Sequence, residues 1–194
     1  LNGGLKLTKV NELYDKTLEC PVCNKEFTTK KVRTSRLRLV KRDEDFLSYY
    51  EGENPIKYSI FICPSCGYAG TENRYDSIKK EDREIILNEI TSKWNKRNYG
   101  DKRTVDEAIE TYKLALYIGQ LLDYKKVDLG SLCLNTAWLY RIKKSQEEMR
   151  FLSLAKDFFE EAFYNESLVG TNMDELKLGY LLGETNRRLD LKEQ

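Results

Sequence analysis

Four of the five cysteines fall into two short pairs whose spacing is typical of zinc knuckles. The pairs are Cys20-Pro-Val-Cys23 and Cys63-Pro-Ser-Cys66. A residue that tolerates a left-handed backbone follows each pair, Asn24 or Gly67, as the tight turn after the second sulfur requires. Two such turns can bring four thiolates to one tetrahedral ion, at about 2.3 Å from each sulfur. The pattern therefore predicts one zinc ion held by all four cysteines.

Two other interpretations of these cysteines stay open from the sequence. One Cys-x-x-Cys pair could be a redox centre, although no βαβ pattern surrounds either pair. Two disulfides would need an oxidising compartment, and no secretion signal is visible. The 39 residues between Cys23 and Cys63 exceed the roughly 15–20 of most zinc ribbons, which indicates an inserted loop over 43–55. An ion with four thiolate ligands has no open position, so its expected role is structural.

The chain contains no histidine, and this excludes several catalytic classes. Ser-His-Asp and Cys-His pairs, HExxH metalloproteases and a histidine proton switch all need an imidazole. Carboxylates such as Glu44 or Glu110 are unplaced acid/base candidates, and the fifth cysteine, Cys133, lies on a helical apolar stripe where burial is expected. We therefore expect no enzyme.

A basic segment between the two knuckles is the best candidate for nucleic-acid contact. Seven cations lie within it: Lys30, Lys31, Arg33, Arg36, Arg38, Lys41 and Arg42. Cations on one face beside a ribbon could follow a phosphate backbone. The alternative is a solvated or internally paired face, because the acidic cluster over 43–45 and four zinc-bound thiolates could balance these charges.

Around the cysteines, apolar patterning predicts short strands. Strands are expected over Val32–Val40, where leucine and arginine alternate, and over Tyr58–Cys63, which is rich in β-branched and aromatic residues. Phe27 and Tyr68 lie close to the knuckles in sequence, and packing near the metal is their expected role.

After residue 77 the chain contains no proline and its apolar residues recur at helical spacing. Helices are expected over 79–97, 105–124, 129–143 and 174–189, with a capping box formed by Thr104 and Glu107. A shift of 47 residues places one pattern on another: Ala108, Tyr112, Ala115, Leu116 on Ala155, Phe159, Ala162, Phe163. The same shift matches Leu134 with Leu181 and Arg141 with Arg188. Stacked helical hairpins explain this repeat, and a non-repetitive bundle is the alternative.

Together these patterns predict an α+β fold. A small four-cysteine zinc ribbon with short antiparallel strands and an inserted loop is expected over 1–76, and an all-α region of tetratricopeptide-like helical hairpins over 77–194. Metal removal is expected to unfold the first part while the helices persist.

Long stretches of the sequence resemble one bacterial family. LYDKTLECPVCNKEFTTKKVRTSRLRLVKRDEDF, NPIKYSIFICPSCGYAG and the later AWLYR are similar to the domain-of-unknown-function family numbered 2225, common in clostridia and bacilli. The likeness covers nearly the whole chain and implies a zinc ribbon joined to tetratricopeptide-like helices, but no activity. Family members often carry Cys at the position of Leu47 and continue past ETNRRLD with another helix. The resemblance therefore implies that only the knuckle cysteines are ligands here and that this chain is short at its C-terminus.

Composition and the absence of a site for chemistry favour an adaptor. The 194 residues carry a formal charge of +1, with no apolar run long enough for a membrane span and no leader, so a cytoplasmic protein is expected. The leading hypothesis is a zinc-binding scaffold whose helices bind a protein partner or a second copy of the chain. A nucleic-acid module using residues 30–42 is the second hypothesis, and an enzyme is the third.

Overall fold

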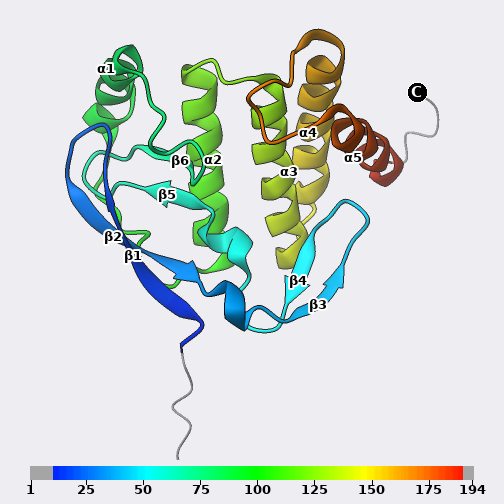
Figure 1. Ribbon diagram of the computed structural model, residues 1–194, viewed down its shortest axis with the longest axis horizontal. Coiled ribbons are helices and arrows are strands. Elements are labelled where there is room, and N and C mark those ends of the chain that lie inside the picture. The colour runs from blue at the N-terminus through cyan, green and yellow to red at the C-terminus, as the bar shows by residue number, and fades with distance from the viewer. Residues whose placement is uncertain (1–10, 190–194) are drawn as a thin grey trace, which may run out of the picture.

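The computed structural model describes residues 11–189, and within them three two-stranded antiparallel sheets precede five α-helices (Figure 1). The strands are β1 (Leu13–Glu19), β2 (Glu26–Val32), β3 (Leu39–Arg42), β4 (Ser48–Tyr50), β5 (Ile60–Ile62) and β6 (Ala69–Thr71). The helices are α1 (Lys80–Glu89), α2 (Val105–Leu121), α3 (Lys126–Lys143), α4 (Glu147–Asn165) and α5 (Glu175–Arg188). This arrangement confirms the α+β class. The expectations about the two ends of the chain concern residues 1–10 and 190–194, which lie outside the described residues.

Each cysteine knuckle is the turn of a β-hairpin. Strands β1 and β2 pair over their whole length, from Leu13 opposite Val32 to Glu19 opposite Glu26, and the first knuckle joins them. Strands β5 and β6 form the second, shorter hairpin around the other knuckle. The two hairpins therefore lie at the two ends of the insertion over 33–59 and bring these ends together at the cysteine knuckles.

The insertion is itself a hairpin, β3–β4, and the single strand expected over Val32–Val40 is wrong. Strand β2 ends at Val32, and a 3-10 turn, η1 (Thr34–Arg36), separates it from β3. The turn forms because the Arg36 N–H donates to the Arg33 carbonyl at 2.9 Å, which redirects the chain. The leucine-arginine alternation marks no buried face, since Leu39 is 52% exposed.

Two other expected elements are shorter than their sequence patterns indicate. The 3-10 turn η2 (Pro55–Tyr58) replaces the start of the strand expected over Tyr58–Cys63. The helix expected over 79–97 ends at Glu89, and the 3-10 turn η3 (Thr91–Lys93) follows it. The chain leaves its helical path because Thr91 Oγ1 donates to the Cys66 carbonyl at 2.9 Å and Trp94 Nε1 to the Pro64 carbonyl at 3.0 Å. Bonds to the second knuckle therefore replace the last turns of this helix.

The helices expected over 105–124, 129–143 and 174–189 correspond to α2, α3 and α5, and α4 carries the second copy of the repeated pattern. The capping box of α2 is present, with Glu107 N–H donating to Thr104 Oγ1 at 3.1 Å and Thr104 N–H donating back to the Glu107 carboxylate at 2.7 Å. Consecutive helices from α2 to α5 contact one another, as in stacked hairpins. The first three repeated positions are buried in both copies; at the fourth position Leu116 is half-buried and Phe163 is 46% exposed.

Close approach of α3 and α4 depends on one glycine. A Cβ atom at Gly130 would lie 2.5 Å from the Phe159 ring, so only glycine permits this spacing. The aromatic residue of one repeat thus fills the space that a missing side chain leaves on the neighbouring helix.

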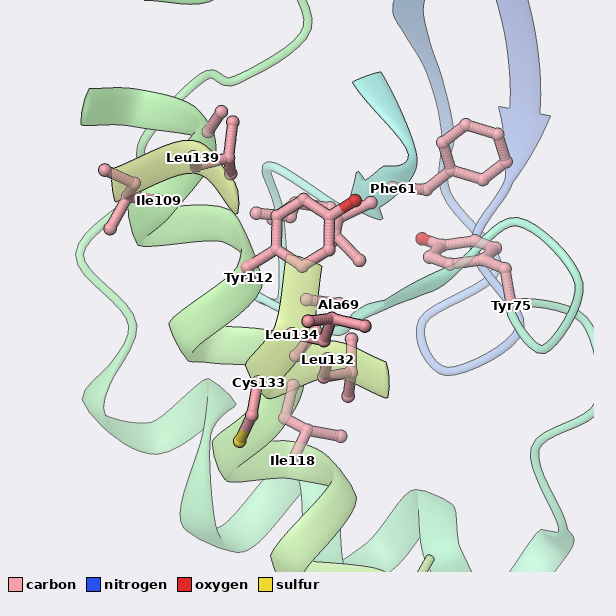
Figure 2. Packing of buried hydrophobic residues seen from close by; sticks show 14 of the residues in the cluster. Phe61, Ala69, Tyr75, Ile109, Tyr112, Ile118, Leu132, Cys133, Leu134 and Leu139 are labelled. Atoms are coloured by element: carbon pink, nitrogen blue, oxygen red, sulfur yellow. The ribbon is translucent and has the colours of Figure 1, made fainter. Parts of the chain in front are cut away.

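One cluster of buried residues runs through both the cysteine hairpins and the helices. Tyr112 of α2 points toward the β5–β6 hairpin, with Phe61 and Tyr75 beyond it (Figure 2). Leu132 and Leu134 of α3 lie next to Ala69 in the same cluster (Figure 2). The division at residue 76 stays a prediction, but the two parts share their core. None of the helices within residues 11–189 has the length and apolar content that crossing a bilayer needs.

Candidate metal centre and groove

The two knuckles have the same backbone geometry. In the first, Asn24 N–H donates to the Cys20 carbonyl at 2.8 Å, and in the second Gly67 N–H donates to the Cys63 carbonyl at 2.9 Å. Asn24 and Gly67 have φ values of 57° and 77°, the left-handed turns expected after each second cysteine. The sequence thus predicted both turns correctly.

All four knuckle sulfurs converge. The Sγ atoms of Cys20, Cys23, Cys63 and Cys66 lie within 4.8 Å of one another. Two separations between the knuckles are 3.5 Å, from Cys20 to Cys66, and 3.6 Å, from Cys23 to Cys63. These separations approach the roughly 3.8 Å edge of a tetrahedron with 2.3 Å metal–sulfur bonds. The cysteines are free thiols rather than disulfides, and together they form a candidate metal site.

The surroundings of the sulfurs fit a bound cation. Hydrogen bonds from the Cys20 and Cys66 side chains, followed by backbone N–H groups, lower the pKa of the Cys63 thiol, whereas hydrogen bonds with Cys20 and Cys63 raise the pKa of Cys66. The Tyr75 hydroxyl is fully buried beside this cluster and has no hydrogen-bond partner among the described residues. Burial, and then the negative charges of Cys20 and Cys63, raise the pKa of Tyr75, so it stays a donor. A thiolate held by a metal is the acceptor that this hydroxyl lacks.

Aromatic side chains cover the candidate metal centre. The Tyr75 ring lies 6.0 Å from Phe27 and 5.0 Å from Tyr68, measured between centroids. The packing expected for Phe27 and Tyr68 is therefore confirmed. Trp94 lies against Gly67 so closely that a Cβ atom there would meet the indole at 2.6 Å. The sequence pattern did not single out Tyr75 or Trp94, because each follows the knuckles on a segment with no metal motif.

The basic segment is divided between separate elements. Lys30 and Lys31 are on β2, Arg36 is in η1, and Lys41 and Arg42 are on β3. Several of its cations have acidic partners: Lys30 with Asp15 at 2.6 Å, Lys31 with Glu72, Lys41 with Asp43 at 3.3 Å and Arg38 with Glu51 at 3.8 Å. Arg33 lies over the Tyr14 ring, and Arg42 Nε donates to Ser48.

The two carboxylates considered as acid/base candidates form ion pairs, and the fifth cysteine is a core residue. Glu110 pairs with Arg97 at 3.0 Å, and Glu44 lies 3.6 Å from Arg188. Cys133 is completely buried in the core, and burial raises the pKa of its thiol to about 12, so it is a packing residue as expected.

An ion-pair cluster joins the inserted hairpin to the helices, and we call it the arginine clamp: Asp43, Asp45, Arg141 and Arg188. The Arg141 guanidinium reaches Asp45 at 2.7 Å and Asp43 at 2.9 Å. Arg188 lies 3.4 Å from Asp45. Trp138 Nε1 also donates to Asp45, whose side chain is 1% exposed. Burial acts to raise the pKa of Asp45, but the hydrogen bond and charge of Arg141, the hydrogen bond from Trp138 and the charge of Arg188 together outweigh burial and lower the pKa.

Both arginines of the arginine clamp belong to the 47-residue sequence repeat. Arg141 and Arg188 occupy matching positions 47 residues apart, and both approach the same buried carboxylate. The sequence matched these arginines with each other but gave no sign of their acidic partner.

A groove lies between the β5–β6 hairpin, the inserted hairpin and the helices. Its larger cavity measures about 310 Å³ and is lined by the β6 turn, α3 and the start of α5. A second cavity of about 280 Å³ adjoins it, and the two share Phe46, Thr71, Asn135 and Trp138. Phe46 comes from the inserted hairpin, so this hairpin, the β5–β6 hairpin and the helices α2, α3 and α5 all contribute to the groove.

Comparison with known proteins places the chain in a bacterial family. A curated relative from Borreliella burgdorferi, described as an uncharacterized protein, is 25% identical over 182 residues. The match covers 84% of this chain and 65% of the relative, so this chain spans about 65% of the relative's length. No solved structure matches significantly. The model of the family described as "Uncharacterized protein conserved in bacteria (DUF2225)" matches residues 13–194, from β1 to the end of the chain, and the chain belongs to that family.

Proposed function

We propose that the protein is an intracellular adaptor with one structural zinc ion and a groove that binds a protein partner. The observation that carries the proposal is the groove itself, since three parts of the fold meet there and leave an amphipathic hollow open to a ligand. The proposal includes no catalytic step.

Zinc is the proposed metal because four thiolates in a closed tetrahedral set favour it over magnesium or calcium. Cys20, Cys23, Cys63 and Cys66 would hold it. The ion would cross-link the two cysteine hairpins, and the side chains that line the groove would bind the protein partner. Elemental analysis of the purified chain should give one zinc per chain, lost in Cys63→Ser and retained in Cys133→Ser. Retention of zinc by Cys63→Ser, or another metal in its place, would refute this assignment.

Photo-crosslinking in living cells tests the adaptor role. A photoreactive amino acid at Asn172, on the rim of the groove, should capture a protein, while the same group at exposed Asp157 on α4 should not. Mass spectrometry then identifies the adduct, and a second copy of the chain would mean self-association through the groove. If Asn172 captures no protein above the level at Asp157, the proposal fails.

The nucleic-acid hypothesis remains the alternative, and the ion pairs of Lys30, Lys31 and Lys41 weigh against it. Exposed Arg36 and Arg38 are the cations to change. Binding to DNA or RNA that falls with salt and is lost in the double variant Arg36→Glu with Arg38→Glu would replace the adaptor proposal. Absence of salt-dependent binding in the wild type would remove the alternative.

A further inference from the structure

The shape of the groove suits an extended ligand. Its two cavities, about 310 and 280 Å³, meet at Asn135 and Trp138 of α3 and continue toward β4 and η2. The larger cavity is lined by α3, by the turn after β6 and by the start of α5, so a hairpin turn and two helices surround it. Each cavity alone is near the lower limit of roughly 300 Å³ for a ligand pocket, but the pair forms a channel.

Three asparagines line the larger cavity with unused hydrogen-bonding capacity. Asn73, Asn135 and Asn172 come from the β6 turn, α3 and the loop before α5. Within residues 11–189 none of their side-chain amides has a hydrogen-bond partner; Asn73 and Asn172 are exposed, whereas Asn135 is half-buried. A carboxamide offers both a donor and an acceptor, as a peptide group does. Amides spaced along a channel therefore match the main chain of an extended peptide.

The charge of the larger cavity favours an acidic ligand. Arg74 and Asp128 pair at 2.8 Å and cancel each other. Lys177, exposed on α5, also lines the cavity and has no ion-pair partner among residues 11–189. One uncompensated cation thus lies beside the unused amides.

Apolar side chains provide a place for a hydrophobic residue of the ligand. Trp138 and Met173 are half-buried and face the cavity from α3 and the loop before α5. An indole gives a broad apolar surface, and a methionine adapts its shape to what it contacts.

From these features, and resting on the proposed adaptor function, we infer that the groove binds an extended acidic peptide segment of a protein partner. The peptide backbone bonds to Asn73, Asn135 and Asn172. A carboxylate of the peptide pairs with Lys177, and a neighbouring apolar side chain lies between Trp138 and Met173.

Selection from a phage-displayed library of random dodecapeptides against the zinc-loaded full chain tests this inference. Enriched peptides should place Asp or Glu beside a large apolar residue. A synthetic peptide of the enriched sequence should bind about tenfold more weakly to Lys177→Glu and to Asn135→Leu, since each change removes one charged or buried hydrogen-bond partner. Lys96→Glu, an equal charge change at an exposed position away from the groove, should bind as the wild type does. Circular dichroism and zinc content show whether each variant is folded.

Several outcomes overturn the inference. These are enrichment of peptides without acidic residues, binding that Lys177→Glu leaves unchanged, no enrichment at all, or a small molecule retained in the groove by native mass spectrometry. If the Asn172 crosslink captures a protein but acidic peptides are not enriched, the inference fails and the adaptor proposal stands. If neither captures a ligand, both fail.

Discussion

Replacing Arg141 with methionine should destabilise the protein by about 3 kcal/mol, because it leaves Asp45 buried without its main partner. Removing one member of a buried ion pair typically costs roughly 3–5 kcal/mol. Asp45 is 1% exposed and keeps Arg188 at 3.4 Å and the indole of Trp138 at 2.9 Å, so the lower end of that range applies. Met preserves much of the length and apolar stem of Arg141, which limits the contribution of lost packing.

The pH dependence of this loss follows from the pKa of Asp45. In the wild type that pKa lies below the ordinary 3.8, so ionised Asp45 contributes stability above pH 4, which is lost as the pH falls through the folded value. Without Arg141, burial dominates and raises the pKa in the folded state. The charged carboxylate then destabilises the variant at neutral pH, and protonation relieves this. The difference between wild type and variant should therefore be largest near pH 7 and should shrink below about pH 4.

Urea unfolding with excess zinc, followed by tryptophan fluorescence, measures both effects. Trp138 contacts Asp45 directly and reports on the arginine clamp. Arg150→Met is the matched control, because its ion pair with Glu147 at 3.3 Å is exposed and should contribute less than about 1 kcal/mol. A loss in Arg141→Met no greater than in Arg150→Met, or one independent of pH, would refute the reasoning.

Three further changes test other parts of the structure. Chelating the metal should unfold the cysteine hairpins and also lower the melting temperature of the helices, because they share a core; helices that melt unchanged would instead favour two independent parts. Tyr75→Phe should speed zinc release to a chromogenic chelator by about tenfold, since the buried Tyr75 hydroxyl lies beside the cysteine sulfurs. Tyr164→Phe changes a side chain that is 72% exposed and should leave the rate of release unchanged. Equal rates in both variants would show that Tyr75 does not contact the metal centre. Gly130→Ala should lower the free energy of unfolding by about 1–3 kcal/mol, because the added methyl group would clash with the Phe159 ring. Gly183→Ala has open space around it and should raise the free energy of unfolding by about 0.5–1 kcal/mol through better helix propensity. Equal effects of the two changes in a thermal melt would contradict the packing of α3 on α4.

Local chemistry made the four-cysteine candidate site and the helices after residue 104 predictable. A knuckle is specified by neighbouring residues, as Asn24 shows with its left-handed backbone directly after Cys23. The capping box of Thr104 and Glu107 likewise lies within one helical turn. Such features do not depend on distant parts of the chain, so their sequence patterns are sufficient.

Features that depend on long-range contacts were missed or misplaced. Trp94 continued a helical pattern, yet its bond to Pro64 takes it out of the helix. Arg103 has an ordinary surface residue type, but it is 2% exposed and donates to the carbonyls of Lys57 and Ile60. Tertiary hydrogen bonds override helical propensity and residue-type preference in both cases, and no local pattern encodes them.

The unusual length between the knuckles has a structural reason. A zinc ribbon does not need 39 residues between its cysteine pairs, but here those residues include the hairpin that carries Asp43 and Asp45 to the helices. The hairpin that presents these carboxylates also places Phe46 at the junction of the two cavities. Because both repeat-related arginines hold the same hairpin, loss of the arginine clamp should loosen one wall of the groove while leaving the four sulfurs in place. Arg141→Met should therefore weaken binding of the selected peptide while the chain keeps its full zinc content, and loss of zinc together with binding would show that the insertion supports the metal centre instead.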